Sequence, residues 1–496
     1  MKNTIKMLGL AVVIAAITFS MTACEQQDPG DPTPQLWQYD VKNLEQVAGS
    51  VLPVIVELLN PGYSSGAVTV YYNGSETLPQ EAGSYPITFD VAEAEGWQAA
   101  TGLNPEKTLE VKAIPNPFTT IASLATWLAS APANTAANPF NIVLNVDSLG
   151  GRSTAEGSLG KVLVNNLTKF IKLDLSGSTL DKIETYAFYS VKESGGAIID
   201  SPLVEIIIPD TVTTIEANAF YYCNNLVKVN IHDKVKTIGN DAFNNCKSLT
   251  SIDIPDSVTN LGTEAFAYTG LTSVTMPPKL TQYGFGFFAG CASLTEIKVA
   301  EGDNNFSTED GVLYSKDGKS LYQYPLGKTG TSFEIPATVT EIKGYAFYGC
   351  KFTSITIPDA VTQIGNYAFS NSSLTSITIP DAVTTISQYA FFNCDSLTDV
   401  TIGSGITKIW QYAFNNCDKL TKITIPNITA TFEEGVFGID LIEVTFAGTS
   451  ITLDQYGSFY GFATTQTGLN TLYSSGGAGT YIREARTSQA WVKKED

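Results

Sequence analysis

Histidine is almost absent from this chain of 496 residues, and its scarcity limits the chemistry available to it. His232 is the single histidine, so a Ser-His-Asp or Cys-His pair for nucleophilic catalysis would have to use it. It stands in "NIHDKVKTI", where similar segments have Pro255, Pro358 or Pro380, and we place it at a strand end rather than in a pocket. We therefore expect no enzyme, although a pair of carboxylates suited to glycoside hydrolysis could not be recognised from sequence.

The motifs that hold metals and nucleotides are also missing. The chain has no His-Glu-x-x-His, no Gly-x-x-x-x-Gly-Lys-Ser/Thr loop, no Gly-x-Gly-x-x-Gly turn and no Cys-x-x-Cys pair. We expect no catalytic residue, no metal site and no cofactor.

Positive charge is in short supply. Lysine and arginine number 29 against 49 aspartates and glutamates, which gives a formal net charge of −20. Nucleic acids and anionic membrane surfaces are bound through basic patches, so both are excluded as partners. A protein partner with basic patches, or a polar hydrogen-bonded interface, fits this charge.

The first 23 residues predict a secretion signal. Lys2 and Lys6 precede the apolar run "MLGLAVVIAAITFS", which is too short to span a membrane comfortably. The run ends in "MTAC", which resembles the lipobox of bacterial lipoproteins, in which Cys24 would be lipidated and become the first mature residue. The resemblance implies that the chain contacts a membrane only through the lipid on Cys24.

A repeat of 22–23 residues dominates the rest of the chain, and "TSITIPDAVT" occurs twice within it. A short strand such as "LTSITI" is followed by proline, by "VTxI" and by "AFxxC". One such coil cannot bury its own apolar face, so the repeat predicts a stacked solenoid. The repeat phenylalanines include Phe220, Phe243, Phe347, Phe369, Phe391 and Phe414.

Six cysteines follow repeat phenylalanines at the same spacing, whereas Ser372 and Thr269 take that place in two other repeats. A disulfide framework would not tolerate such replacements, so we expect free, buried thiols that pack as small hydrophobic side chains. They are Cys223, Cys246, Cys291, Cys350, Cys394 and Cys417.

The step from Phe288 to Phe347 is 59 residues, which predicts an insertion of about 37 residues at about 300–335. "VLYS" and "SLYQYP" flank Lys316-Asp317-Gly318, which predicts a hairpin. Acids in this segment do not have the spacing of a calcium loop.

The pattern I-P-x-x-V-T-x-I-x-x-x-A-F-x-x-C-x-x-L resembles the BspA-like leucine-rich repeat family of bacterial surface proteins. Members of that family are cell-surface adhesins for host matrix proteins or other bacteria, so the resemblance implies such a partner. Upstream, "AGSYPITFDV" is similar to a strand motif of small immunoglobulin-like modules of bacterial surface proteins.

The predicted fold class is a β-rich leucine-rich repeat solenoid, with irregular or short helical turns, preceded by a small β-sandwich. The predicted segments are a signal peptide (1–23), a flexible linker (24–35), the immunoglobulin-like β-sandwich (36–114), an N-terminal cap (115–182), the repeats (183–440) and a C-terminal cap (441–496).

Two surfaces are candidates for binding a partner. Strand positions that face solvent predict a flat face rich in serine and threonine, formed by Ser354, Thr356, Ser376, Thr378, Asp399, Thr401, Lys422 and Thr424. A second column, two residues before the repeat phenylalanine, holds Tyr345, Tyr367, Tyr389 and Tyr412. Threonine also suits any exposed strand, and stacked tyrosines also stiffen an array, so a purely structural role remains open for both.

We expect a lipid-anchored cell-envelope protein, exposed on the outer membrane, whose solenoid binds proteins and mediates adhesion. The alternatives are a periplasmic scaffold lipoprotein and a glycan-binding protein.

Overall fold

The computed structural model describes residues 39–48, 51, 53–58, 67–92, 99–192, 198–330, 332–426, 429–438, 440–448, 452–453, 473, 476–483 and 491–494. The predicted signal peptide, the linker and Cys24 lie outside these residues. The chain forms two compact units, one of residues 1–44, 53–79 and 84–110 and one of residues 45–52, 80–83 and 111–496.

The first unit is built of antiparallel strands. β1 (Tyr39–Lys42) pairs with β3 (Ile55–Leu58), while β4 (Val68–Tyr72) and β6 (Ala100–Leu103) pair with β5 (Gly83–Val91). Alternate side chains of β5, at Ile87, Phe89 and Val91, are buried, as expected of a strand with one face on a core. Asn73 and Gly74 both have positive φ and form a turn directly after β4. β7 (Thr108–Lys112) lies beside β5, and β2 (Glu45–Val47) belongs to the second unit.

The solenoid begins with a cap of two helices and two strands. α1 (Ile121–Ser130) buries Leu124 and Leu128. The other elements are α2 (Leu159–Val164), β8 (Phe140–Val143) and β9 (Ile171–Asp174). β8 pairs with β9, and β9 pairs with the first long strand of the array, so the cap starts the sheet.

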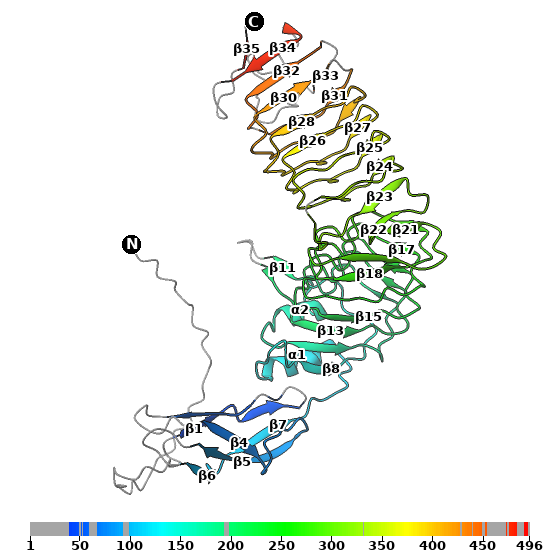
Figure 1. The fold of residues 1–496 in the computed structure, drawn as a ribbon. Helices are drawn as coiled ribbons and strands as arrows, with labels where there is room; N and C mark the ends of the chain where they lie inside the picture. The colour runs from blue at the N-terminus through cyan, green and yellow to red at the C-terminus, as the bar shows by residue number, and fades with distance from the viewer. Residues whose placement is uncertain are drawn as a thin grey trace, which may run out of the picture. The chain divides into compact units, whose positions relative to one another are not determined.

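Most coils contribute a longer strand on one side and a two-residue strand on another, and strands from neighbouring coils pair in parallel (Figure 1). The longer strands come from the "LTSITI" segment, and we call their sheets the long-strand face: β13 (Leu203–Ile207), β15 (Lys228–Asn230), β18 (Ser273–Met276), β20 (Glu296–Val299), β26 (Ser376–Thr378), β28 (Asp399–Thr401), β30 (Lys422–Ile425) and β32 (Glu443–Phe446).

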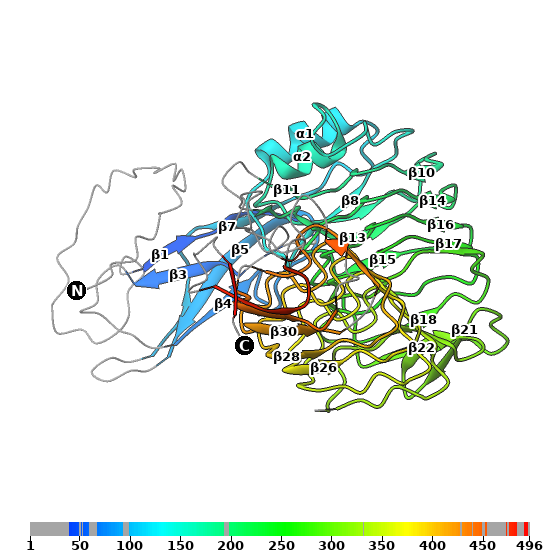
Figure 2. The ribbon, with the colours of Figure 1, turned by 90° about the horizontal axis from the view of Figure 1, so that it is seen from above.

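The two-residue strands come from "VTxI" and form the short-strand face. In Figure 2, β14, β16 and β17 lie together along one side of the coils, apart from β13 and β15. The strands are β10 (Lys182–Ile183), β14 (Thr214–Ile215), β16 (Thr237–Ile238), β17 (Asn260–Leu261), β19 (Gln282–Tyr283), β24 (Glu341–Ile342), β25 (Gln363–Ile364), β27 (Thr385–Ile386), β29 (Lys408–Ile409), β31 (Thr431–Phe432) and β33 (Thr452–Leu453).

The repeat phenylalanines form a buried column that runs through the array. Phe220 and Phe243 stack with ring centroids 5.0 Å apart, and Phe369 and Phe391 at 5.1 Å, with rings parallel to within 5°. The backbone N–H of each of these four donates to an alanine carbonyl in the next coil, as from Phe220 to Ala242 at 2.8 Å. Small alanine beside large phenylalanine therefore sets the spacing of the coils, which confirms the predicted solenoid.

The cysteines form a second buried column, and all six described cysteines are free, as predicted. Their role is more than packing, because the thiols also donate hydrogen bonds. Five thiols lie 3.0–3.2 Å from the carbonyl oxygen of the repeat phenylalanine one coil earlier: Cys223, Cys246, Cys291, Cys394 and Cys417. Burial raises the pKa of the Cys291 thiol to about 11 and that of Cys350 to about 12, so both stay protonated donors at neutral pH.

Part of the predicted insertion belongs to the array. The insertion holds β21 (Phe306–Glu309), β22 (Val312–Ser315) and β23 (Ser320–Gln323), and β22 and β23 form the predicted hairpin around Gly318. β23, however, also pairs in parallel with β24, in the register that β24 keeps with β25.

Tyr324, 23 residues before Phe347, then takes the place of a repeat phenylalanine. Its N–H donates to Ala346 at 2.8 Å and its ring stacks on Phe347 at 5.9 Å. The extra residues are therefore fewer than the predicted 37, because one coil is contained within that stretch.

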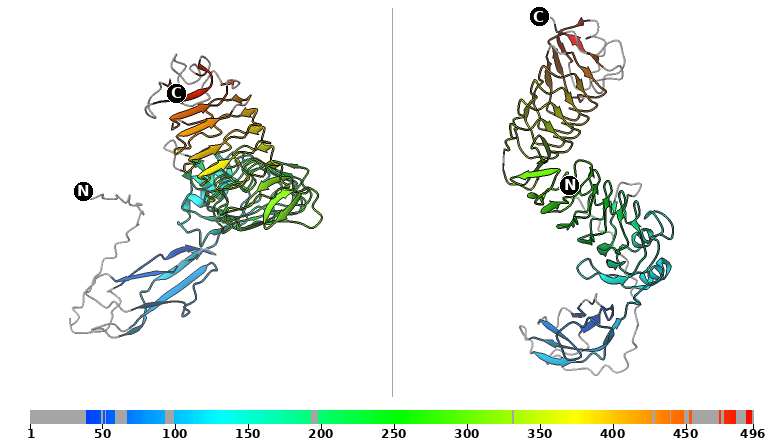
Figure 3. Two further views of the ribbon diagram at one scale, coloured as in Figure 1. Left: turned by 45° about the horizontal axis from the view of Figure 1, so that its top comes forward. Right: turned by 90° about the vertical axis from the view of Figure 1, so that its right-hand side faces the viewer.

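The last coils are closed by strands that run against the array (Figure 3). β34 (Gly479–Ile482) pairs antiparallel with β32, and β35 (Val492–Lys493) pairs antiparallel with β34. Trp491 is 2% exposed there, so the described part of the predicted C-terminal cap covers the end of the core.

Candidate functional site

The long-strand face presents the predicted serine and threonine positions to solvent. All eight are exposed: Ser354, Thr356, Ser376, Thr378, Asp399, Thr401, Lys422 and Thr424. They alternate with buried isoleucines such as Ile377 and Ile423, because successive side chains of a strand point to opposite faces. Parallel pairing places Thr378 beside Thr401, and Thr401 beside Thr424. The face is therefore a regular array of short polar side chains.

A hollow of about 720 Å³ lies on this face towards its C-terminal end. Its lining includes Asp399, Thr401, Lys422 and Thr424, four of the predicted residues, together with Glu443. Lys422 and Glu443 form an ion pair across neighbouring strands at 3.7 Å. The hollow thus combines hydroxyls with charges of both signs, which suits a polar partner surface.

The tyrosine column is a stack of rings on another side of the coils. Successive centroids among Tyr345, Tyr367, Tyr389 and Tyr412 are 4.9, 4.7 and 5.2 Å apart, and neighbouring planes are within 17°. All four residues have φ near +60°, a conformation that the coil imposes at this turn. Each interior ring face is covered by the next ring, so the column offers ring edges and hydroxyls to solvent.

Tyr345 is the buried member of the column and joins the two halves of the array. Its side chain packs with Ala267 and Ala289, and its ring stacks on Phe285 at 6.0 Å. A Cβ on Gly286, which has φ of +64°, would lie 2.8 Å from the Tyr345 ring, so glycine leaves the room for it. The predicted column therefore divides into one structural residue and three partly buried ones, Tyr367, Tyr389 and Tyr412.

Further aromatic residues on the same side were not predicted as a site. They stand one or two positions after the repeat phenylalanine, and they comprise Tyr189, Tyr221, Tyr222, Tyr268, Tyr348 and Phe392. Tyr221 and Tyr222 contact edge to face at 4.6 Å, and the hydroxyl of Tyr268 donates to that of Tyr348 across the insertion. We call this group and the tyrosine column together the aromatic face. Its signal was present in the repeat alignment, at the two positions after each phenylalanine.

Two carboxylates interrupt the aromatic face in the first half of the array. Asp241 and Glu264 occupy the positions that tyrosines hold in the second half. The amide nitrogen of Asn244 donates to Asp241 Oδ1 at 2.7 Å and lies 3.4 Å from Glu264 Oε2, and the Tyr345 hydroxyl donates to Glu264. Burial raises the pKa of both carboxyl groups, since these neutral donors only partly replace water.

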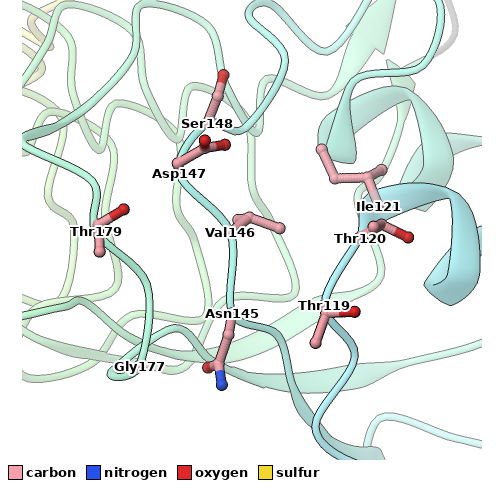
Figure 4. Close-up of a pocket in the computed structure, with 9 residues that line it drawn as sticks. All are labelled: Thr119, Thr120, Ile121, Asn145, Val146, Asp147, Ser148, Gly177 and Thr179. Carbon is pink, nitrogen blue, oxygen red and sulfur yellow. The ribbon is translucent and has the colours of Figure 1, made fainter.

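A smaller hollow of about 490 Å³ lies in the N-terminal cap (Figure 4). Thr119, Thr120 and Ile121 line one side and Gly177 and Thr179 the other, with residues 145–148 between them. The Thr120 hydroxyl already accepts the N–H of Ser123 at the start of α1. Asp147 is the one charged side chain of the lining, so this hollow has no pair of catalytic groups.

Both ring nitrogens of His232 form hydrogen bonds with the backbone. Its Nδ1 accepts the N–H of Lys234 at 3.2 Å, which leaves Nε2 to donate to the Pro209 carbonyl at 2.7 Å. Among the residues that the structure describes, no group of three or more histidine, cysteine, aspartate or glutamate side chains could hold a metal ion. None of the described helices has both the length and the apolar character needed to cross a membrane.

The repeats match a known family. Residues 196–310 and 325–441 match the family described as BspA type leucine-rich repeat region, in six copies. These two ranges therefore carry BspA-type leucine-rich repeats. The unmatched stretch, 311–324, contains β22, β23 and Tyr324, where the coil departs from the consensus.

Several solved structures are similar to the chain. The pneumococcal vaccine antigen PcpA is 22% identical over 54% of this chain and 74% of its own, with a TM-score of 0.46. A leucine-rich cell surface protein of Faecalibacterium prausnitzii is 27% identical over 58% of this chain and 82% of its own, with a TM-score of 0.46. A leucine-rich repeat protein of Eubacterium ventriosum is 22% identical over 82% of this chain and all of its own, with a TM-score of 0.48. No curated protein is significantly similar to the chain.

Proposed function

We propose that the chain is a lipid-anchored cell-surface protein whose solenoid binds other proteins and serves in adhesion. In this proposal Cys24 carries the lipid, residues 36–114 form an immunoglobulin-like spacer, and the outer membrane presents the repeats to the exterior. The BspA-type repeats support this, because proteins with such repeats include bacterial cell surface proteins.

The observation that carries the binding role is the long-strand face. Strands from successive coils present short polar side chains in register, and a hollow of about 720 Å³ lies among β28, β30 and β32. A regular face of this kind binds through many weak contacts along an extended partner surface. The partner we propose is a host extracellular-matrix protein or a surface protein of another bacterium.

A double substitution tests this role. Thr401→Arg with Thr424→Arg places two bulky cations in the hollow, and both sites are exposed, so folding is expected to be unaffected. Cells that carry the variant are expected to adhere at least about tenfold less to a panel of matrix proteins and bacterial cells than wild-type cells do. Gln363→Arg with Gln282→Arg, exposed on the short-strand face, is the matched control. Equal adhesion by both variants would remove the long-strand face from the proposal.

Glycan binding through ring stacking has less support. A sugar packs against an open ring face, whereas the interior rings of the tyrosine column cover one another at 4.7–5.2 Å. The proposed protein partner needs no free ring face.

A further inference from the structure

The aromatic face carries negative charge and no positive charge at the repeat turns. From two residues before the repeat phenylalanine to three after it, the eight coils from Phe220 to Phe414 read NAFYYC, DAFNNC, EAFAYT, GFFAGC, YAFYGC, YAFSNS, YAFFNC and YAFNNC. These eight segments contain two acids, Asp241 and Glu264, and no lysine, arginine or histidine. Neither acid forms an ion pair with a described basic residue, and Asp241 Oδ2 accepts no hydrogen bond from the described residues.

The long-strand face carries charges of both signs, and several of its lysines form ion pairs, whereas Asp253 and Asp399 form none with a described residue. Lys422 pairs with Glu443 at 3.7 Å, Lys298 with Glu296 at 3.2 Å, and Lys172 with Glu205 at 2.8 Å. The aromatic face is therefore set apart by the lack of any basic residue in its eight segments, and not by unpaired acids alone.

Tyrosine rings flank the two carboxylates on both sides. Tyr221 and Tyr222 lie in the coil before Asp241, and Tyr268 follows Glu264 within its own coil. The electrostatic influence of Asp241 reaches Tyr221, and that of Glu264 reaches Tyr268. Carboxylates set among tyrosine rings are the surroundings that a guanidinium group prefers, because it pairs with carboxylates in its plane and stacks through its face.

The protein itself provides one example of this contact. In the first coil Tyr186 stands at the equivalent position, two residues before Phe188, and the guanidinium of Arg152 lies 5.0 Å from the centroid of that ring. Arg152 comes from the cap, so an arginine that is not part of the repeat already occupies this column. The next positions of the column, Asn218, Asp241 and Glu264, have no such arginine.

We propose that the aromatic face, centred on Asp241 and Glu264, docks an extended arginine-containing segment of a partner protein. The guanidinium groups pair with the two carboxylates and lie against Tyr222 and Tyr268. The two acids stand on consecutive coils, so an extended segment that crosses the coils presents alternate side chains to them. This inference rests on the proposed function, in that it assumes a protein partner, and it adds the chemistry of that partner.

The energetic reason is the cost of the unpaired acids. Burial disfavours the ionised form of both carboxyl groups, and Asn244 and Tyr345 supply only neutral hydrogen bonds. An arriving guanidinium supplies the opposite charge and two parallel donors, so binding relieves a cost that the free protein bears.

The test uses the full chain and a fluorescent synthetic peptide, Arg-Ser-Arg-Ser-Arg-Ser-Arg, followed by fluorescence anisotropy. The probe for comparison has citrulline in place of arginine, which keeps the shape and removes the charge. Asp241→Asn with Glu264→Gln is expected to weaken arginine-peptide binding at least about tenfold, and citrulline peptide is expected to bind at least about tenfold more weakly than the arginine peptide. Asp256→Asn with Asp359→Asn changes the net charge equally at exposed positions outside the long strands and outside the eight segments, and it is expected to leave binding within about twofold.

Three results would each overturn the inference: no binding of the arginine peptide, equal weakening by both double variants, or equal binding of the citrulline peptide. A lysine peptide that binds as tightly would show that charge alone is recognised, which also contradicts the arginine assignment. Thermal melts of the variants confirm that they are folded. The two proposals can fail separately. If the peptide does not bind but adhesion still depends on Thr401 and Thr424, this inference is wrong and the proposed function is still supported.

Discussion

The two halves of the solenoid share one backbone and differ in one column of side chains. Two residues before the repeat phenylalanine, the second half has four tyrosines, whereas the first half has Asn218, Asp241, Glu264 and Gly286. Backbone φ at these eight positions lies between +54° and +64°. The coil therefore fixes where and how the side chain leaves the backbone, and the choice of side chain at that point remains free.

The comparison separates what makes the fold from what makes a surface. Phenylalanine, alanine and cysteine occupy buried columns in both halves, and their contacts hold the coils together. The column two residues before the repeat phenylalanine differs between the halves. In the second half it is a stack of tyrosine rings that cover one another, and in the first half it contains two carboxylates without an ion pair to a described residue. Recognition is therefore expected to differ between halves even though the repeat is nearly the same.

The largest expected effect is on the shared core, and it should be the same in both halves. Phe243→Ala and Phe391→Ala each remove a fully buried ring from the column, and each is expected to cost about 3–5 kcal/mol of unfolding free energy. Guanidinium denaturation followed by circular dichroism measures both. A marked difference between the two would show that the halves do not share one packing scheme.

Within the tyrosine column the effects should be unequal. Tyr345→Ser removes a ring that is 9% exposed and packs on Ala267 and Ala289, at a cost of about 2–3 kcal/mol, whereas Tyr389→Ser should cost about 1 kcal/mol. Chemical denaturation of the two single variants gives the comparison. Equal costs would mean that Tyr345 does not join the halves.

The cysteine column gives a smaller effect. Cys394→Val removes the donor to the Phe369 carbonyl and is expected to cost about 1 kcal/mol, whereas Cys394→Ser keeps a donor and should cost less. Ser372, which already stands in this column, supports the second expectation. The melting temperatures of the two variants test this order. If Cys394→Val is the more stable variant, the thiols contribute only through packing and not through hydrogen bonds.

The smallest effect concerns pH and the two carboxylates. Burial raises the folded-state pKa of Asp241 and Glu264 above the ordinary 3.8 and 4.5, so the folded protein holds these protons more tightly than the unfolded chain. Their contribution to stability is present below pH about 4 and is lost as pH rises through the raised pKa values. Asp241→Asn with Glu264→Gln removes this loss. The melting temperature of the wild type should therefore fall more between pH 4 and pH 7 than that of the variant. Parallel pH profiles would contradict the assigned shifts.

The period of the repeat was sufficient to predict the solenoid, the buried cysteines and the exposed serine and threonine positions. It could not reveal the coil that contains Tyr324, because Gln-Tyr replaces Ala-Phe there and the array continues through pairing of β23 with β24. Nor could it reveal the burial of Tyr345, which depends on Ala267, Ala289 and Gly286, some 60–80 residues earlier in the chain. Those contacts form only when the coils stack across the insertion.

The carboxylate site was missed for another reason. In the aligned sequence, Asp241 and Glu264 are visible only as positions that lack tyrosine, and their neighbours Tyr222 and Tyr268 belong to a different column of the repeat. Stacking brings the two columns onto one side of the coil, where neither acid forms an ion pair with a described basic residue. A single period therefore predicts the core well and the surface poorly.

The central claim, that the solenoid acts on the outside of the cell, is tested most directly by protease treatment of intact cells. A blot for this protein is compared with one for a periplasmic control. The account predicts that the protein is digested while the control survives. Survival of the protein until the envelope is broken would contradict surface adhesion and would leave a periplasmic scaffold in its place.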